Sequence, residues 1–107
     1  MSIFTKGDIV IVRFPYTNFE EFKIRPALIL SVMDNDDYVV CRISSKQKVD
    51  TISIHQKDYV ISPLSISSYV NFKKLAAING TLIMAKASKV APNKYNEIVN
   101  AIYKYIK

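Results

Sequence analysis

The fold of this chain is decided by residues 7–31, GDIVIVRFPYTNFEEFKIRPALILS. The apolar, β-branched run at 9–14 predicts a strand, which ends at Pro15 because proline cannot donate to a strand ladder. The apolar run at 27–33 predicts a second strand that is buried on both faces. Because neither run has a polar face, we expect both strands to be central in a sheet.

A polar and aromatic loop, residues 15–24, joins the two runs. Phe19 and Phe22 in this loop fit neither strand nor helix spacing, and exposed loop aromatics of this kind often serve binding. Arg25 and Pro26 follow, and a residue that precedes proline favours extended backbone. The pattern therefore places an arginine at the mouth of a core strand, where it can meet an anion.

The rest of the chain is predicted to form further short strands. Turn residues at 34–36 join the second strand to a third in a hairpin. Asn79-Gly80 is the strongest hairpin signal in the chain and predicts that the segments on either side of it pair. The strands expected after the first two lie at 38–43, 51–55, 69–78 and 81–90.

The last segment changes its period. Apolar residues between 95 and 106 follow helical spacing, and Pro92 suits the first turn of a helix. The fold class that we predict is therefore mainly β with a C-terminal helix, a small antiparallel barrel. We expect a single domain over residues 1–107.

Composition excludes several classes of protein. Half of the 107 residues are apolar and 22% are charged, which argues against disorder. No apolar run approaches the ~20 residues that span a bilayer, and the first residues do not resemble a signal peptide. We therefore expect a cytoplasmic protein with no membrane contact. Cys41, the single cysteine, lies in an apolar run and is expected to be a buried, unreactive thiol.

The net charge of +6 is unevenly distributed. Residues 1–37 carry four basic and six acidic groups, whereas residues 38–107 carry eleven basic and three acidic groups. A basic surface attracts polyanions through a salt-sensitive, sequence-independent interaction. A lysine surface that serves only solubility is the alternative.

Few residues are suited to catalysis. With one histidine and two glycines, the chain offers no Cys/His metal cluster and no glycine-rich phosphate loop, so we expect neither metal nor cofactor. The candidate group is Arg25 with Ser44 and Ser45, which the hairpin would bring opposite each other. An arginine fork matches phosphate oxygens, and a hydroxyl can donate to the same oxygens. A purely structural role at strand ends is the alternative.

Four blocks of the sequence, KGDIVIVRFPYTN, RPALILS, CRISSK and SYVNFKKL, resemble PemK/MazF-type toxins of bacterial toxin–antitoxin pairs. The resemblance implies a compact SH3-like, CcdB/PemK-type barrel, usually a homodimer. It also implies a metal-independent endoribonuclease that cuts single-stranded RNA at short sequences and is blocked by a cognate antitoxin.

The resemblance also implies residue roles. Arg25 matches the catalytic arginine of the family, and Ser44 matches its catalytic threonine or serine. The 2′-OH would attack the adjacent phosphate and leave a 2′,3′-cyclic phosphate. Glu20 or Glu21 is the candidate for proton transfer. The residues expected to bind RNA are Phe19, Phe22, Lys23, Ser45, Lys46 and Lys73.

Two other classes stay open. One is a non-catalytic toxin of the same barrel type that binds DNA gyrase. The other is a catalytically weak nucleic-acid-binding barrel, because Asn71 and Lys73 stand where some family members carry a second arginine and an acid.

Overall fold

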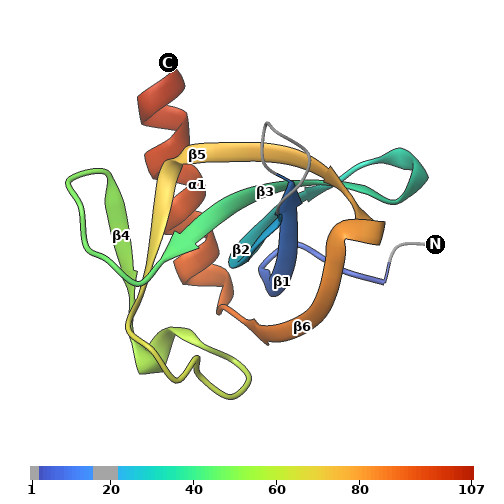
Figure 1. Ribbon diagram of the computed structural model, residues 1–107. Coiled ribbons are helices and arrows are strands. Elements are labelled where there is room, and N and C mark those ends of the chain that lie inside the picture. Colours follow the sequence, from blue (N-terminus) through green and yellow to red (C-terminus); the bar gives the residue numbers. More distant parts are fainter. Residues whose placement is uncertain (1–2, 16–21) are drawn as a thin grey trace.

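The computed structural model describes residues 3–15 and 22–107. Within these residues, one antiparallel sheet of six strands curls into a barrel-like shape, and a single helix lies against it (Figure 1). The strand order is β4-β5-β3-β2-β1-β6. The mainly β fold class with a C-terminal helix is confirmed.

The described residues form strands, short 3-10 turns and one helix. The strands are β1 (Asp8–Pro15), β2 (Phe22–Val32), β3 (Asp37–Ser44), β4 (Thr51–Ile54), β5 (Ser68–Asn79) and β6 (Ile83–Lys89). The 3-10 turns are η1 (Asp34–Asp36), η2 (Gln56–Asp58) and η3 (Gly80–Leu82), and the helix is α1 (Pro92–Ile106).

The two apolar runs of the first 33 residues form central strands, as predicted. β1 lies between β6 and β2, and β2 lies between β1 and β3. Ile9 and Leu28, opposite each other in the ladder, belong to a buried cluster that includes Ile98 of α1. Val10 and Ala27, the next pair, belong to a second buried cluster. Because successive strand residues face opposite sides, both faces of the sheet are covered.

The bounds predicted for β2 are wrong at both ends. The strand begins at Phe22, so Arg25 and Pro26 lie within it and not at its mouth. Its pairing with β1 continues to Phe22 opposite Pro15, and this ladder extends the strand into the expected loop. At the other end Val32 is 37% exposed, so the strand is not buried along its whole length.

The hairpin through η1 joins β2 to β3 as predicted. The hairpin predicted at Asn79-Gly80 is wrong, because β6 pairs with β1 and not with β5. The Asn79 amide donates to the Asp37 carboxylate at 2.9 Å, and its oxygen accepts from the Thr81 N–H at 3.0 Å. A Cβ at Gly80 would lie 2.1 Å from an Asp36 carboxylate oxygen, so η3 is pressed against η1. The chain therefore turns away from β5 and crosses to β1.

A buried ion pair holds α1 to η2. Lys94 Nζ lies 3.4 Å from Asp58 Oδ2, with side chains 8% and 6% exposed, and donates to the Ser53 carbonyl at 3.2 Å. Burial alone would raise the pKa of Asp58. The hydrogen bond from the His55 N–H and the Lys94 ammonium outweigh it and hold that pKa below its ordinary value.

The predicted C-terminal helix is present, with Pro92 in its first turn and Ile98 and Ile102 buried. In the part of the chain that the structure describes, no helix has the length and apolarity that a bilayer crossing requires.

Candidate functional site

A cleft of about 590 Å³ opens where β2 and β3 separate. The ladder between these strands ends at the pair Ala27 and Arg42. The residues of β2 before Ala27 and the residues of β3 after Arg42 do not pair with each other. In this region β2 remains paired with β1, and β3 remains paired with β5 as far as Ser44. Pro26 stands where the strands part, so its missing N–H interrupts no ladder on the β3 side.

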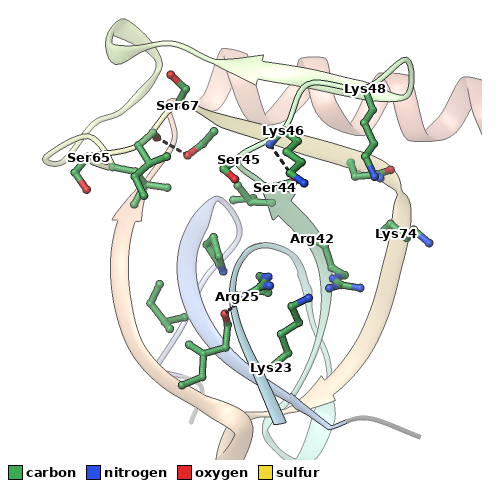
Figure 2. A pocket seen from close by; sticks show the side chains of 18 residues that line it. Lys23, Arg25, Arg42, Ser44, Ser45, Lys46, Lys48, Ser65, Ser67 and Lys74 are labelled. Atoms are coloured by element: carbon green, nitrogen blue, oxygen red, sulfur yellow. Dashed lines mark hydrogen bonds between the residues drawn. The ribbon is translucent and has the colours of Figure 1, made fainter. Parts of the chain in front are cut away.

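Three segments wall this cleft. The first is the start of β2 from Lys23 to Pro26, and the second is the end of β3 with the lysines that follow it. The third is the stretch from Leu64 to Ser68, which leads into β5, and Ile11 of β1 with Asn71 and Lys74 of β5 complete the lining. In Figure 2, Arg25 and Ser44 lie in the middle of the cleft, between the serines of the third wall and the side of Lys48 and Lys74.

Arg25 is half-buried on β2. One Nη1 hydrogen bond, 2.9 Å long, goes to the carbonyl of Ile24 and fixes the side chain against its own strand. A guanidinium has five N–H donors. Within residues 3–15 and 22–107 no carboxylate pairs with Arg25, so the remaining donors are available to an anion in the cleft.

Ser44 ends β3 with its hydroxyl in the cleft. Its Oγ accepts a hydrogen bond of 3.0 Å from the Lys46 N–H, which is a local turn motif at a strand end. Because that bond uses the oxygen as an acceptor, the hydroxyl hydrogen remains able to donate. Arg25 and Ser44 thus present donors of two kinds to one space, which is the chemistry that a phosphate group needs.

The electrostatics of the cleft are one-sided. Among the described residues, its lining includes six cationic side chains and no carboxylate: Lys23, Arg25, Arg42, Lys46, Lys48 and Lys74. In the described part of the chain, ion pairs occupy other lysines, namely Lys73, Lys86, Lys89 and Lys94. Unpaired charges of one sign in a concave site focus the potential and attract polyanions.

The structure brings five of the predicted site residues together in this cleft. They are Arg25, Ser44, Lys23, Ser45 and Lys46. Arg25, Ser44 and Ser45 thus line one cleft, although the β2–β3 ladder ends at Ala27 opposite Arg42, before it reaches them. The chemical roles of these residues stay predictions. Phe19, Glu20 and Glu21 lie outside the described residues.

Lys73 and Phe22 are not among the residues that line the cleft. Lys73 pairs with Asp50 at 3.0 Å, and its ammonium lies 4.7 Å from the ring centre of Tyr105. The hydrogen bond with Asp50 raises the pKa of Lys73. Phe22 lies in β2 with the Arg13 guanidinium 4.2 Å above its ring. Both side chains have local partners, and their predicted contact with RNA stays a prediction.

Lys74 lines the cleft, although the sequence predicted Lys73 at this site. Strict alternation along β5 would place Lys73 on the same face as Asn71, which lines the cleft. The ladder slips here: β3 advances two residues from Cys41 to Ile43, while β5 advances five from Leu75 to Val70. The irregularity reverses the alternation and brings Lys74 to the cleft.

Other cleft residues were missed because they are not adjacent in sequence. Arg42 lies two residues before Ser44, on the strand side that alternation assigns to the same face. This spacing is a signal that could have found it. Ser65 and Ser67 come from a loop whose position no local pattern shows.

Cys41 plays no part in this chemistry. Its side chain is fully buried, and its S–H donates to the Asn71 carbonyl at 2.8 Å. Burial raises the pKa of the thiol to about 12, so the thiolate does not form at neutral pH. The prediction of a buried cysteine is confirmed, and its lack of reactivity stays a prediction that the raised pKa supports. Among the described side chains, no three of His, Cys, Asp or Glu gather as metal ligands would.

Comparison with known proteins gives one family. The model of the PemK-like, MazF-like toxin of type II toxin–antitoxin systems matches residues 5–106. Among curated proteins, no match to this chain is found.

Three solved structures illustrate the similarity of fold. An endoribonuclease from a mycobacterial species, solved with its cognate antitoxin, has a TM-score of 0.75 at 19% identity, covering 94% of this chain and 92% of that chain. The MazE–MazF complex from Deinococcus radiodurans has a TM-score of 0.77 at 14% identity, with 97% and 96% covered. The Mycobacterium tuberculosis toxin MazF-mt6 has a TM-score of 0.70 at 16% identity, with 91% and 93% covered. At these identities the likeness concerns the fold.

Proposed function

The chain belongs to the family of PemK-like, MazF-like toxins of type II toxin–antitoxin systems, and we propose that it cuts single-stranded RNA without a metal ion. The observation that carries this proposal is the cleft around Arg25 and Ser44, lined by six cations and no described carboxylate. The cleft has a phosphate-binding pair at its centre and positive charge on its walls, which suits a chain of phosphates.

The proposed reaction is a transesterification within the RNA. The 2′-oxygen attacks the adjacent phosphorus, the bond from phosphorus to the 5′-oxygen breaks, and the products carry a 2′,3′-cyclic phosphate and a 5′-OH. Arg25 stabilises the charge that develops on the phosphoryl oxygens, and one such donor is commonly worth ~2.7–4 kcal/mol. The Ser44 hydroxyl donates to a phosphoryl oxygen.

The reaction also requires proton transfer from the 2′-OH and to the leaving 5′-oxygen. We assign acceptance of the first proton to Glu20 or Glu21, which precede β2 in the chain. No carboxylate or histidine among the described residues lines the cleft, and this supports a proton acceptor from elsewhere in the chain.

Lys23, Ser45 and Lys46 are proposed to hold the RNA backbone on either side of the reacting phosphate. An unpaired strand presents its bases for stacking, and Phe19 and Phe22 are proposed as stacking surfaces. Lys73 lies outside the cleft lining. It is therefore proposed to contact only an RNA that is long enough to extend beyond the cleft.

The proposed partners are a cognate antitoxin and a second copy of this chain. Two of the similar structures were solved with an antitoxin or as a MazE–MazF complex. An acidic antitoxin segment would compete with RNA for the cationic cleft. The site of action is proposed to be the cytoplasm, where the RNA substrate is found.

The two alternative classes fare differently. The family match and the similar structures do not favour a gyrase-binding toxin. A catalytically weak nucleic-acid-binding barrel would have the same cleft. The cleavage products of an RNA assay would distinguish it from an active enzyme.

The test is to incubate the purified protein with a long single-stranded RNA in EDTA. We expect defined fragments whose 5′ ends accept a label from polynucleotide kinase without prior phosphatase treatment, and whose 3′ ends carry the cyclic phosphate. Binding without cleavage, or cleavage that needs a divalent metal, would contradict the proposal. A parallel gyrase supercoiling assay is expected to show no inhibition.

A further inference from the structure

A second, smaller pocket of about 260 Å³ adjoins the cleft. Leu64, Ser65, Ile66 and Ser67 line both hollows, so the cleft and the smaller pocket meet at this loop. Figure 2 shows Ser65 and Ser67 on the side of the cleft away from Lys48 and Lys74. An RNA strand that runs from Arg25 toward this loop would approach the smaller pocket at one end of its path.

The size of the pocket is below the ~300–1,000 Å³ typical of sites for drug-sized ligands. It suits one planar ring system, not a longer ligand. Its far wall is formed by His55, Gln56 and the half-buried Tyr59. Burial is the main cause that raises the pKa of Tyr59, so its phenol stays neutral. The pocket thus combines two flat rings with an amide.

Gln56 is the group that can discriminate. Its side chain is exposed, and no hydrogen bond to it is found within the described residues. An amide offers donors and an acceptor together, which matches the edge of a nucleobase. Rings such as those of His55 and Tyr59 stack on unpaired bases.

The pocket is also held in place before any ligand arrives. The backbone N–H of Asp58 donates to the His55 carbonyl at 2.9 Å, and the Asp58 carbonyl accepts from the Ala91 N–H at 2.7 Å. The Asp58 carboxylate pairs with the buried Lys94 of α1. Tyr59 itself forms a β-bridge with Val90. A turn tied to α1 and β6 presents its side chains with little ordering cost on binding.

We propose that this pocket receives the unpaired base of one nucleotide beside the cleaved phosphate, so that His55 and Gln56 determine part of the sequence that the protein selects. This inference rests on the proposed ribonuclease function and adds the site of one base to it. Gln56 contacts the edge of the base, and His55 stacks on its face.

The first experiment sequences the cleavage junctions of an RNA library with a randomised segment. In Gln56→Ala and His55→Ala, we expect the preference ratio at one recognised position to fall by about 5- to 150-fold, the range for loss of one good base contact. Preferences at other positions should stay. Lys57→Ala is the matched control, because Lys57 lies in the same turn and lines neither pocket. Unchanged preferences in both variants, or a uniform loss of rate, would overturn the inference.

The second experiment does not depend on cleavage. His55 is the single histidine, so its imidazole proton signals identify it without further assignment. Adding a short oligonucleotide that lacks the reactive 2′-OH should shift these signals, and Gln56→Ala should weaken the shift. If the oligonucleotide shifts the signals but RNA is not cleaved, the base pocket is supported and the protein binds RNA without cutting it. Cleavage without any shift overturns the base pocket and leaves the nuclease standing.

Discussion

Replacing Arg25 by alanine tests the central assignment of the cleft. Its guanidinium uses one N–H on the Ile24 carbonyl and keeps the others for the substrate. Removal of one donor aimed at developing charge costs ~2.7–4 kcal/mol in the transition state, which is about 10²–10³ in rate. We therefore expect Arg25→Ala to slow RNA cleavage by about that factor. Arg25→Lys should recover part of the rate, because it keeps the charge and loses the fork.

Lys104→Ala is the matched control for this change. Lys104 is exposed in the last turn of α1, and it does not line the cleft. Both substitutions remove one positive charge. The assay is single-turnover cleavage of a labelled RNA in EDTA, at two salt concentrations, with thermal unfolding measured for each variant.

Two results would refute the reasoning. If Arg25→Ala cleaves as fast as the parent protein, Arg25 does not stabilise the transition state. If Lys104→Ala and Arg25→Ala lose rate equally, and added salt removes the difference from the parent protein, the effect comes from net charge and not from position.

Three further predictions concern the site and the fold. Ser44→Ala should slow cleavage by about 10- to 100-fold through loss of a hydrogen bond to a charged group, and Ser44→Thr should restore the rate in the same assay; an alanine variant at full rate would show that the hydroxyl is not used. Lys94→Met leaves the buried Asp58 carboxylate without its cation and should lower the free energy of unfolding in urea by about 3–5 kcal/mol. Asp58→Asn in the same chain should recover much of that loss, and a single-variant loss below about 1 kcal/mol would contradict the role of the pair. Because the pKa of folded Asp58 lies below its ordinary 3.8, the unfolded state binds more protons in acid, so the free energy of unfolding should fall as the pH drops from 3.8 through the folded value. Asp58→Asn should make this slope shallower, and equal slopes in urea titrations of the two proteins would refute the assignment.

The sequence by itself determined the parts of the fold that rest on local pattern. The apolar runs predicted central strands, the turn at 34–36 predicted the β2–β3 hairpin, and helical spacing predicted α1. The β2–β3 hairpin brings Arg25 and Ser44 to the lining of one cleft, as counting back from the turn predicted, although its ladder has one irregularity between Ile29 and Ser31. These features depend on residues close together in the chain.

Only the tertiary structure decided the rest of the site. The pairing of β6 with β1 depends on the contact of η3 with η1, which local turn signals at Asn79-Gly80 do not contain. Lys74, and not Lys73, lines the cleft because the ladder between β3 and β5 is irregular. The third wall of the cleft, and with it the smaller pocket, comes from a loop held to distant elements. The physical reason is common to all three, because each depends on contacts between segments far apart in the sequence, and a periodic pattern records only which face of its own element a residue occupies.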